Sequence, residues 1–420
     1  MDKLVIRGGV KLEGVIDIGG SKNAALPIMA AALLSAGKSV LKNVPRLTDV
    51  DTMMNLLNYL GANSWRGAEG ELIIEGAGVN KTVAPYELVS TMRASISVLG
   101  PLLARMGRAN VSHPGGCVIG PRPIDLHIKG LRKLGADISV EHGYVVAAGE
   151  KLKGADIYLG GPFGSTVLGT ANVMTAAVLA EGVTRIENAA CEPEIVDLAQ
   201  FLCKMGARIE GAGTHIVKIS GVARLNGAEH EVISDRIETG THIIAAAITG
   251  GDVLLRGAVY EHIGAVADKL EQANVCITRQ DEGLRVSAEG GLTPVDVVTM
   301  PYPGFPTDMQ AQMMTLMLCA DGISVITERI YPDRFMHVSE LLRMGADIMR
   351  ENERVIVRGG RRLSGAKVMA SDLRASAALV LAGLVAEGET EISRVYHLDR
   401  GYERMEEKLS SAGADIKRVK

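Results

Sequence analysis

Residues 131–138, with the sequence LRKLGADI, have the pattern of a helix end, a turn at Gly135 and the start of a strand. The same pattern returns along the chain at residues 57–62 (LNYLGA), 201–209 (FLCKMGARI), 270–277 (LEQANVCI), 341–348 (LLRMGADI) and 409–416 (LSSAGADI). Its turn residues are 68 to 74 positions apart, at Gly61, Gly135, Gly206, Asn274, Gly345 and Gly413. Gly or Asn suits the left-handed residue that ends a helix. The chain therefore contains six copies of one structural unit.

A second helix in each repeat is apolar nearly all round. Examples are residues 24–34 (AALPIMAAALL) and 375–385 (ASAALVLAGLV). These helices are expected to end at Gly37, Gly107, Gly182, Gly250, Gly322 and Gly388. A helix without a polar face belongs inside a core. Alternating segments such as residues 39–44 (SVLKNV) and 355–357 (VIV) predict strands between the helices.

Six units of this kind predict an α/β protein with two domains of three units each, the helices inside and the sheets outside. A length of 420 residues fits two or three domains. A solenoid of six stacked units is the alternative. No Pro-, Gly- or Ser-rich linker marks the midpoint, so the domain boundary is expected near residues 228–234, between the third and fourth units.

The composition excludes several classes of protein. Hydrophobic content of 47% and charged content of 22% are typical of globular chains. We expect a soluble cytoplasmic protein, because there is no signal pattern at the N-terminus and the longest apolar stretch, residues 375–386, is shorter than the ~20 residues that cross a bilayer. Five scattered cysteines without a CxxC pair predict neither disulfides nor a metal site. A net charge of −4 and 3% aromatic residues argue against nucleic-acid binding.

Charged residues recur at one place in the apolar helices. Arg93, Arg236, Asp308 and Arg374 each lie 14 residues before the glycine of their repeat, and Lys22 lies 15 residues before Gly37. This is the helix start, where free N–H groups favour phosphate and carboxylate groups. Each residue alone could be a helix cap, but arginine is a poor cap. The repeated position therefore predicts a binding site for a polyanionic ligand.

One loop differs from the repeats. Residues 112–123 (SHPGGCVIGPRP) are half Gly and Pro, so we expect neither helix nor strand there. The loop offers Cys117 and Arg122, and a thiol beside a cation can act as a nucleophile or proton donor. The other cysteines, Cys191, Cys203, Cys276 and Cys319, are interpreted as small buried hydrophobic residues.

The motifs together resemble the UDP-N-acetylglucosamine enolpyruvyl transferases. The similar segments run in order from end to end of the chain, at residues 21–27 (SKNAALP), 91–95 (TMRAS), 114–128 (PGGCVIGPRPIDLHI), 235–240 (DRIETG), 305–312 (FPTDMQAQ), 372–376 (DLRAS) and 397–403 (HLDRGYE). The resemblance implies the enolpyruvyl transferase fold, an inside-out α/β barrel in each of two similar domains. It implies a first domain of residues 22–228 and a second of residues 1–21 plus 229–420. The active site is then expected in the cleft between them.

The resemblance also implies the site residues. Lys22, Asp308, Cys117 and Arg400 are expected to be catalytic. Phosphoenolpyruvate and the sugar are expected at Lys22 and Asn23. The nucleotide sugar is expected at Arg93, Arg122, Pro123, Ile124, Asp125, Leu126, His127, Thr166, Val167, Asp308 and the backbone of Ile330. Arg122, Arg374 and Arg400 are expected to hold phosphate and carboxylate, supported by Arg334 and Asp372.

The implied reaction transfers the enolpyruvyl group of phosphoenolpyruvate to the 3′-hydroxyl of UDP-N-acetylglucosamine, the first committed step of peptidoglycan synthesis. Asp308 would take the hydroxyl proton and Cys117, the residue through which fosfomycin inhibits this family, would donate one. No metal or cofactor is implied. The alternatives are transfer to shikimate 3-phosphate, whose enzymes lack the PGGC loop, and a non-catalytic UDP-sugar-binding paralogue. Leu168 and residues 331–334 (YPDR) depart from the family pattern.

Overall fold

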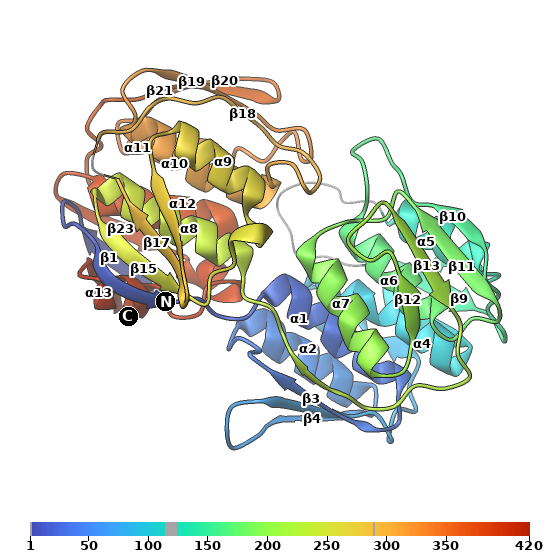
Figure 1. Ribbon diagram of the computed structural model, residues 1–420. Coiled ribbons are helices and arrows are strands. Elements are labelled where there is room, and N and C mark those ends of the chain that lie inside the picture. Colours follow the sequence, from blue (N-terminus) through green and yellow to red (C-terminus); the bar gives the residue numbers. More distant parts are fainter. Residues whose placement is uncertain (1, 114–123, 289) are drawn as a thin grey trace. The chain divides into compact units, whose positions relative to one another are not determined.

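The computed structural model describes residues 2–113, 124–288 and 290–420, which form two compact units (Figure 1). The N-terminal unit consists of residues 20–113 and 124–233, and the C-terminal unit of residues 2–19 and 234–420. Each unit buries its own cluster of apolar side chains. A solenoid would share one continuous core along the chain, so that alternative is wrong.

Three four-stranded sheets are described in the N-terminal unit. The first has the order β14 (Glu229–Glu231), β3 (Lys38–Lys42), β5 (Leu72–Glu75) and β4 (Asn63–Arg66). The second has the order β6 (Val83–Ala84), β7 (Arg108–Ser112), β9 (Tyr144–Ala148) and β8 (Asp137–Glu141). The third has the order β10 (Asp156–Tyr158), β11 (Val183–Glu187), β13 (Ile216–Ser220) and β12 (Arg208–Glu210). In each sheet the first pair is parallel and the other two pairs are antiparallel.

The described part of the C-terminal unit repeats this topology three times. One sheet has the order β2 (Glu13–Asp17), β15 (Asp252–Arg256), β17 (Gly283–Ser287) and β16 (Cys276–Gln280). Another has the order β18 (Val297–Val298), β19 (Ile323–Thr327), β21 (Arg354–Arg358) and β20 (Asp347–Glu351). The last has the order β22 (Lys367–Met369), β23 (Glu389–Ser393), β1 (Lys3–Arg7) and β24 (Asp415–Val419). The first strand of the chain therefore lies between two of its last strands.

The helices fall into two sets. The apolar set comprises α1 (Lys22–Ala31), α4 (Leu99–Met106), α6 (Val167–Ala177), α8 (Arg236–Thr249), α10 (Gln310–Cys319) and α12 (Leu373–Val385). The amphipathic set comprises α2 (Thr48–Tyr59), α3 (Tyr86–Val89), α5 (Asp125–Lys133), α7 (Pro193–Lys204), α9 (Gly264–Gln272), α11 (Val338–Arg343) and α13 (Met405–Ser411). Short 3₁₀ turns complete the described elements, at η1 (Ala32–Leu34), η2 (Arg93–Val98), η3 (Tyr260–His262), η4 (Thr307–Met309) and η5 (Val395–Arg400).

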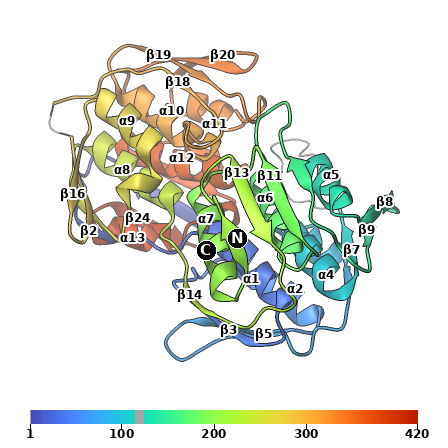
Figure 2. The ribbon, with the colours of Figure 1, turned by 45° about the vertical axis from the view of Figure 1, so that its right-hand side comes forward.

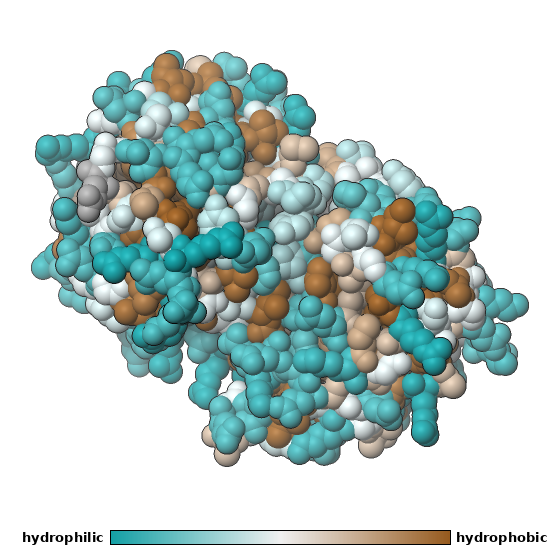
Figure 3. Space-filling view, in the orientation of Figure 1, coloured by the Kyte–Doolittle hydropathy of each residue, from teal (hydrophilic) through white to brown (hydrophobic). Residues whose placement is uncertain are grey.

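The apolar helices form the core of each unit. Helix α12 is buried without a break from Arg374 to Leu384. It packs against α8 and α10, and the sheet β18-β19-β21-β20 covers α10 from outside (Figures 1 and 2). On the face shown in Figure 3, hydrophobic residues of this unit form small patches in a largely hydrophilic surface. The predicted arrangement of inner helices and outer sheets is confirmed.

The repeated turn also has the predicted conformation. The five glycines and Asn274 that mark the repeats have φ angles between 67° and 109°. Only glycine, and less readily asparagine, adopts this region without strain, which explains the residue type at these positions.

The two ends of the N-terminal unit are joined by a backbone hydrogen bond. The Ser21 amide donates to the Ile233 carbonyl at 2.7 Å. In the C-terminal unit, the Asp235 amide donates to the Gly19 carbonyl at 2.8 Å, and the Gly19 amide donates to the Glu238 carboxylate at 2.8 Å. Hydrogen bonds within each unit therefore hold the residues at which the chain passes from one unit to the other, at residues 19–21 and 233–235.

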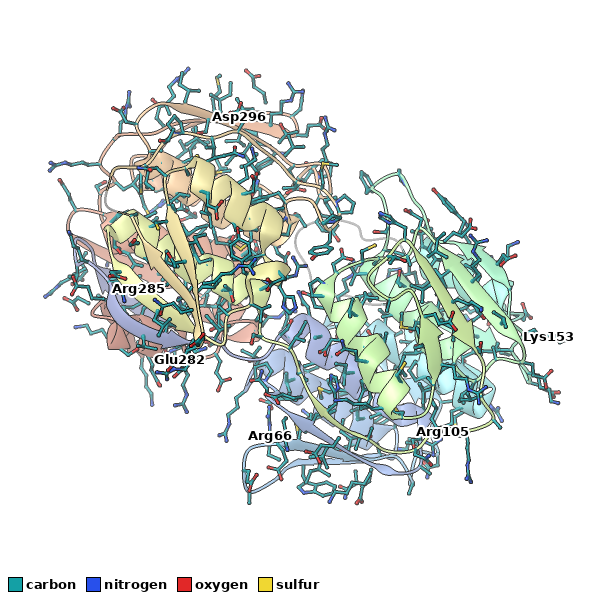
Figure 4. All side chains as sticks on the ribbon, viewed as in Figure 1. Arg66, Arg105, Lys153, Glu282, Arg285 and Asp296 are labelled. Atoms are coloured by element: carbon teal, nitrogen blue, oxygen red, sulfur yellow. The ribbon has the colours of Figure 1, made fainter. Side chains whose placement is uncertain are left out.

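One arginine of α4 binds backbone carbonyls of neighbouring segments in the N-terminal unit. Arg105, labelled in Figure 4, donates from Nη1 to the carbonyls of Leu33 and Ser35 and from Nη2 to that of Gly76, at 2.7 to 3.0 Å. The carbonyls of Leu33 and Ser35 lie just beyond the end of the first apolar helix, where backbone acceptors lack intrahelical partners, and that of Gly76 follows β5.

None of the helices in residues 2–113, 124–288 and 290–420 is long and apolar enough to cross a bilayer.

The buried position of α12 gives a test of the fold. Leu381 is 0% exposed, and Leu381→Ala is expected to lower the free energy of unfolding by about 2–5 kcal/mol, because it removes apolar contacts and leaves a cavity. Leu342 on α11 is 47% exposed, so Leu342→Ala is the matched control and should cost less than about 1 kcal/mol. Urea denaturation followed by circular dichroism measures both. Equal losses would show that α12 is not a core helix.

Candidate active site

The predictions for Cys117, Arg122 and Pro123 lie outside the described residues. The remaining candidate residues divide between the two units. The C-terminal unit contains Asp308, Ile330, Arg334, Asp372, Arg374 and Arg400. The N-terminal unit contains Lys22, Asn23, Arg93, Ile124, Asp125, Leu126, His127, Thr166 and Val167.

Asp308 lies between two arginines. Its Oδ1 accepts from Nη1 of Arg334 at 2.7 Å and its Oδ2 accepts from Nη2 of Arg374 at 2.9 Å. Burial alone would raise the pKa of the Asp308 carboxyl, but the charges and hydrogen bonds of the two arginines hold it well below its ordinary value. The lowered pKa means that the carboxylate is ionised. The Asp308 side chain is 28% exposed, so the carboxylate also remains accessible.

The two arginines are themselves buried, at 6% exposure for Arg334 and 3% for Arg374. Burial alone would lower the pKa of the Arg374 guanidinium, but Asp308 and other acidic groups nearby raise it above its ordinary value. Its guanidinium carbon lies 5.4 Å from the centre of the Tyr402 ring. Among the described residues, Nε and Nη1 of Arg374 have no hydrogen-bond partner. Buried donors of this kind can bind an anionic group.

The structure rejects a capping role for Asp308. The residue lies in η4, before α10, and neither element is capped by a side chain. The carboxylates of Asp235 and Asp372 cap α8 and α12 instead, each accepting from two backbone amides. The charge of Asp235 also acts on Arg374, so the starts of α8, α10 and α12 meet at one end of the C-terminal unit. Arg236 at the start of α8 lies over the Tyr302 ring at 5.6 Å.

Arg400 ends η5, which packs against α12. Burial and the charge of Arg400 lower the pKa of His397, and Asp372 partly offsets them, so these three residues share one region. The neighbouring Asp399 accepts two hydrogen bonds from Arg418, at 3.0 and 2.6 Å. That bidentate pair anchors the segment that carries Arg400.

In the N-terminal unit, Lys22 is the first residue of α1, which Ser21 caps. Its ammonium lies 3.0 Å from the Asp49 carboxylate of α2, and both side chains are largely buried, at 12% and 5% exposure. Asn23 follows it on the same turn and is half-buried. Lys22 therefore has its position set by a buried carboxylate on a neighbouring helix.

His127 on α5 is buried and lies near Arg93, the first residue of η2. Its Nδ1 is 2.9 Å from Nδ2 of Asn172, which also donates to the Ile96 carbonyl. Asn172 Oδ1 accepts from the Gly100 amide at 2.8 Å, which fixes the orientation of the amide group. His127 must then accept at Nδ1 and be neutral. Burial and the charge of Arg93 agree with this, lowering the pKa of His127 to about 3.

The other candidates of this unit lie at helix starts. Asp125 and Leu126 open α5, with Ile124 directly before it. Thr166 caps α6 through its side chain, which accepts from the Gly169 amide at 3.2 Å, and Val167 is the first residue of that helix. Helix α6 contacts both α5 and η2, so these helix starts belong to neighbouring elements.

Sequence reasoning missed several residues that hold the candidates in place, among them Asp49, Asn172, Thr307 and Glu328. Asn172 left a signal, because it is a polar residue in the middle of an apolar helix. The others lie in loops or on amphipathic elements, where a polar residue is ordinary. Thr307 lies next to Asp308 in the sequence, within the motif at residues 305–312, whereas only the fold brings Asp49 to Lys22 and Glu328 to Thr307.

Two cysteine predictions are wrong. Cys203 and Cys276 are exposed, on the outer face of α7 and on the edge strand β16. Cys191 is buried, and burial raises the pKa of the Cys319 thiol to about 12, so neither is a reactive thiolate. Among the described residues, no group of three or more His, Cys, Asp or Glu side chains could hold a metal ion.

The buried neutral His127 gives a pH prediction. Because the pKa of His127 falls from 6.5 to about 3 on folding, its contribution to stability is present above pH 6.5 and is lost as the pH falls toward 3. Between pH 7 and pH 5 the wild type should lose about 2 kcal/mol more unfolding free energy than His127→Gln. Urea denaturation of both proteins at both pH values measures this difference. Equal losses would mean that His127 is not held neutral.

Sequence comparisons place the chain in a known family. The chain matches the family described as EPSP synthase (3-phosphoshikimate 1-carboxyvinyltransferase) over residues 6–409. A UDP-N-acetylglucosamine 1-carboxyvinyltransferase from Methylacidiphilum infernorum is 56% identical over 419 residues, covering 100% of this chain and 99% of the relative. The protein of that name from Myxococcus xanthus is 55% identical over 423 residues and 100% of both chains.

Solved structures show the same fold. The enolpyruvyl transferase NikO from Streptomyces tendae superimposes with a TM-score of 0.89 at 22% identity, covering 100% of this chain and 99% of its own. The EPSP synthase from Acinetobacter baumannii gives a TM-score of 0.76 at 20% identity and 100% coverage of both chains. Family match, full-length relatives and fold agree, and this chain belongs to the UDP-N-acetylglucosamine 1-carboxyvinyltransferases, within the wider EPSP synthase family.

Proposed function

We propose that this chain transfers the enolpyruvyl group of phosphoenolpyruvate to the 3′-hydroxyl of UDP-N-acetylglucosamine and releases phosphate. The observation that carries the proposal is the 55–56% identity, over the whole chain, to relatives named for this activity. The product would enter peptidoglycan synthesis in the cytoplasm. The names of these relatives favour a UDP-sugar over shikimate 3-phosphate as the acceptor.

In the proposed reaction the sugar 3′-oxygen forms a bond to C2 of phosphoenolpyruvate. Asp308 accepts the hydroxyl proton, and C3 takes a proton from Cys117, whose role rests on the sequence alone. The bond from C2 to the phosphate oxygen then breaks, and C3 loses a proton to restore the double bond. Lys22 and the arginines Arg122, Arg374 and Arg400 stabilise the negative charge of phosphate and carboxylate.

The two ion pairs of Asp308 bear on its role as a base. A carboxylate held between two guanidinium groups is ionised but binds a proton weakly. Phosphate or carboxylate groups of the substrates would compete with Asp308 for Arg374 and Arg334. As they take over these contacts, the pKa of Asp308 rises and the carboxylate becomes a stronger base. Substrate binding would in this way activate the residue that accepts the proton.

A direct assay tests the function. Purified protein with phosphoenolpyruvate is expected to release phosphate when UDP-N-acetylglucosamine is added and to release none with shikimate 3-phosphate. Colorimetric phosphate detection and mass spectrometry of the enolpyruvyl ether measure the result. Release with shikimate 3-phosphate alone would reassign the acceptor. No release with either, combined with tight binding of the UDP-sugar, would indicate a non-catalytic binding protein.

Asp308→Asn tests the base. The amide cannot accept the proton, so turnover per folded molecule should fall about 100-fold or more. The variant should also be destabilised, by roughly 3–5 kcal/mol, because Arg334 and Arg374 lose their buried partner. Binding of UDP-N-acetylglucosamine, measured by calorimetry, should persist.

The matched control is Asp252→Asn, which removes one partner of an exposed Asp–Arg pair in the same unit, with Oδ2 of Asp252 2.6 Å from Nη2 of Arg285 (labelled in Figure 4). It should retain full turnover. Wild-type turnover in Asp308→Asn would refute the assignment of Asp308 as the base.

A further inference from the structure

Glu328 is a buried acid that neither the sequence motifs nor the reaction above assigns. It follows β19 and is 0% exposed. Its Oε1 accepts from the Thr299 hydroxyl at 2.8 Å and from the amides of Ile330 and Tyr331 at 2.8 and 2.9 Å. Its Oε2 accepts from the Thr307 hydroxyl at 2.9 Å. Within the described residues it forms no ion pair, which is unusual for a buried carboxylate.

The direction of the two hydroxyl contacts is fixed by their other partners. The Thr307 hydroxyl accepts from Nη1 of Arg334 at 3.0 Å, and guanidinium groups can only donate. The Thr299 hydroxyl accepts from the Arg329 amide at 2.9 Å. Each hydroxyl must therefore direct its own hydrogen to Glu328. All four neighbours of the carboxylate are donors, so the site fits a group that only accepts.

The hydrogen bonds of Glu328 form two arms, one from Oε2 through Thr307 to Arg334 and one from Oε1 to the turn at Ile330 and Tyr331. The first arm ends at the candidate base. The same Nη1 of Arg334 that donates to Thr307 also donates to Asp308 Oδ1 at 2.7 Å. The Nη1 –NH₂ group of a guanidinium has two hydrogens, and these two acceptors use both. With Thr307 held as an acceptor by Glu328, the guanidinium has one orientation, and that orientation places Arg334 on Asp308.

The other arm ends at the candidate nucleotide-sugar contact. The Ile330 and Tyr331 amides both point to Oε1 of Glu328, so the backbone of this turn is fixed by a fully buried group. Glu328 thus links two features that the family resemblance assigns separately, the Ile330 backbone and Asp308. A carboxylate with two oxygens is needed because each oxygen serves a different arm.

We propose that Glu328 is a positioning residue. It holds Thr307 as the acceptor for Arg334 and fixes the Ile330–Tyr331 turn. The proposal rests on the proposed function. Because the Glu328 side chain is fully buried, we expect it to contact neither substrate. Its effect on the reaction passes through Arg334 to Asp308 and through the turn to the nucleotide sugar.

Glu328→Gln separates the two arms. The amide oxygen can still accept from Thr299 and the two backbone amides at the Oε1 position. The –NH₂ group then faces the Thr307 hydroxyl, whose hydrogen loses its acceptor, so only the Arg334 arm is disturbed. We expect kcat to fall roughly 10- to 100-fold, with the KM for UDP-N-acetylglucosamine changed less than about threefold.

Thr307→Val, which removes the hydroxyl at nearly constant shape, should produce the same split between kcat and KM. Thr307→Ser, which returns the hydroxyl, should recover most of the lost turnover. The double variant should be no slower than the slower single variant, because both changes break one link. The matched control is Thr315→Val. Thr315 is also a buried threonine of this unit, but its hydroxyl donates, among the described residues, to the carbonyls of Ala311 and Ala378 alone.

The outcomes are distinct. A wild type that releases no phosphate with either acceptor overturns the proposed function. If the wild type is active, full turnover in Glu328→Gln overturns the positioning role alone. Equal losses in Thr307→Val and Thr315→Val, or no recovery in Thr307→Ser, would also overturn it, since the effect would then reflect general destabilisation. Thermal denaturation of each variant, run in parallel, sets the folded fraction used to normalise turnover.

Discussion

Helices without a polar face are the constraint on which each unit depends. A helix such as α12, buried along its length, must be covered on every side. Two more such helices and three small sheets provide the cover, and the amphipathic helices complete it. The same requirement met three times in each unit accounts for the repeated sheet topology. It also explains why the repeat is visible in the sequence, since each copy must supply one helix for the inside and strands for the outside.

Because the apolar helices are buried along their length, the charged residues of the candidate site lie at the helix starts. In the C-terminal unit the starts of three apolar helices meet, and the arginines there need an acid to compensate their burial. Asp308 supplies it for both Arg334 and Arg374. Binding of anionic ligands and the ionisation of Asp308 are therefore tied together, because both draw on the same guanidinium groups. The N-terminal unit uses the same principle at Lys22, which Asp49 compensates.

Features that repeat were predictable from the sequence, and features that depend on one tertiary contact were not. The positive φ at the repeated glycines and at Asn274 follows from residue type and spacing alone. The apolar helices were predicted because they lack a polar face. The prediction that Cys203 and Cys276 are buried was wrong, because short amphipathic elements look apolar in sequence while one face remains exposed. Glu328 was invisible, since its partners Thr299 and Thr307 come from segments about 20 to 30 residues away.

The place of β1 has a consequence for biosynthesis. This strand leaves the ribosome well before both of its neighbours, β23 and β24, because residues 8–388 separate it from β23. At a synthesis rate of roughly 5–20 residues per second, β1 waits on the order of tens of seconds for its partners. The described residues of the N-terminal unit all lie between residues 20 and 233, so this unit can fold during that interval. A nascent chain therefore carries a folded unit while β1 and its apolar side chains are still unpaired, and β1 stays open to pairing with other chains until β23 and β24 have been made.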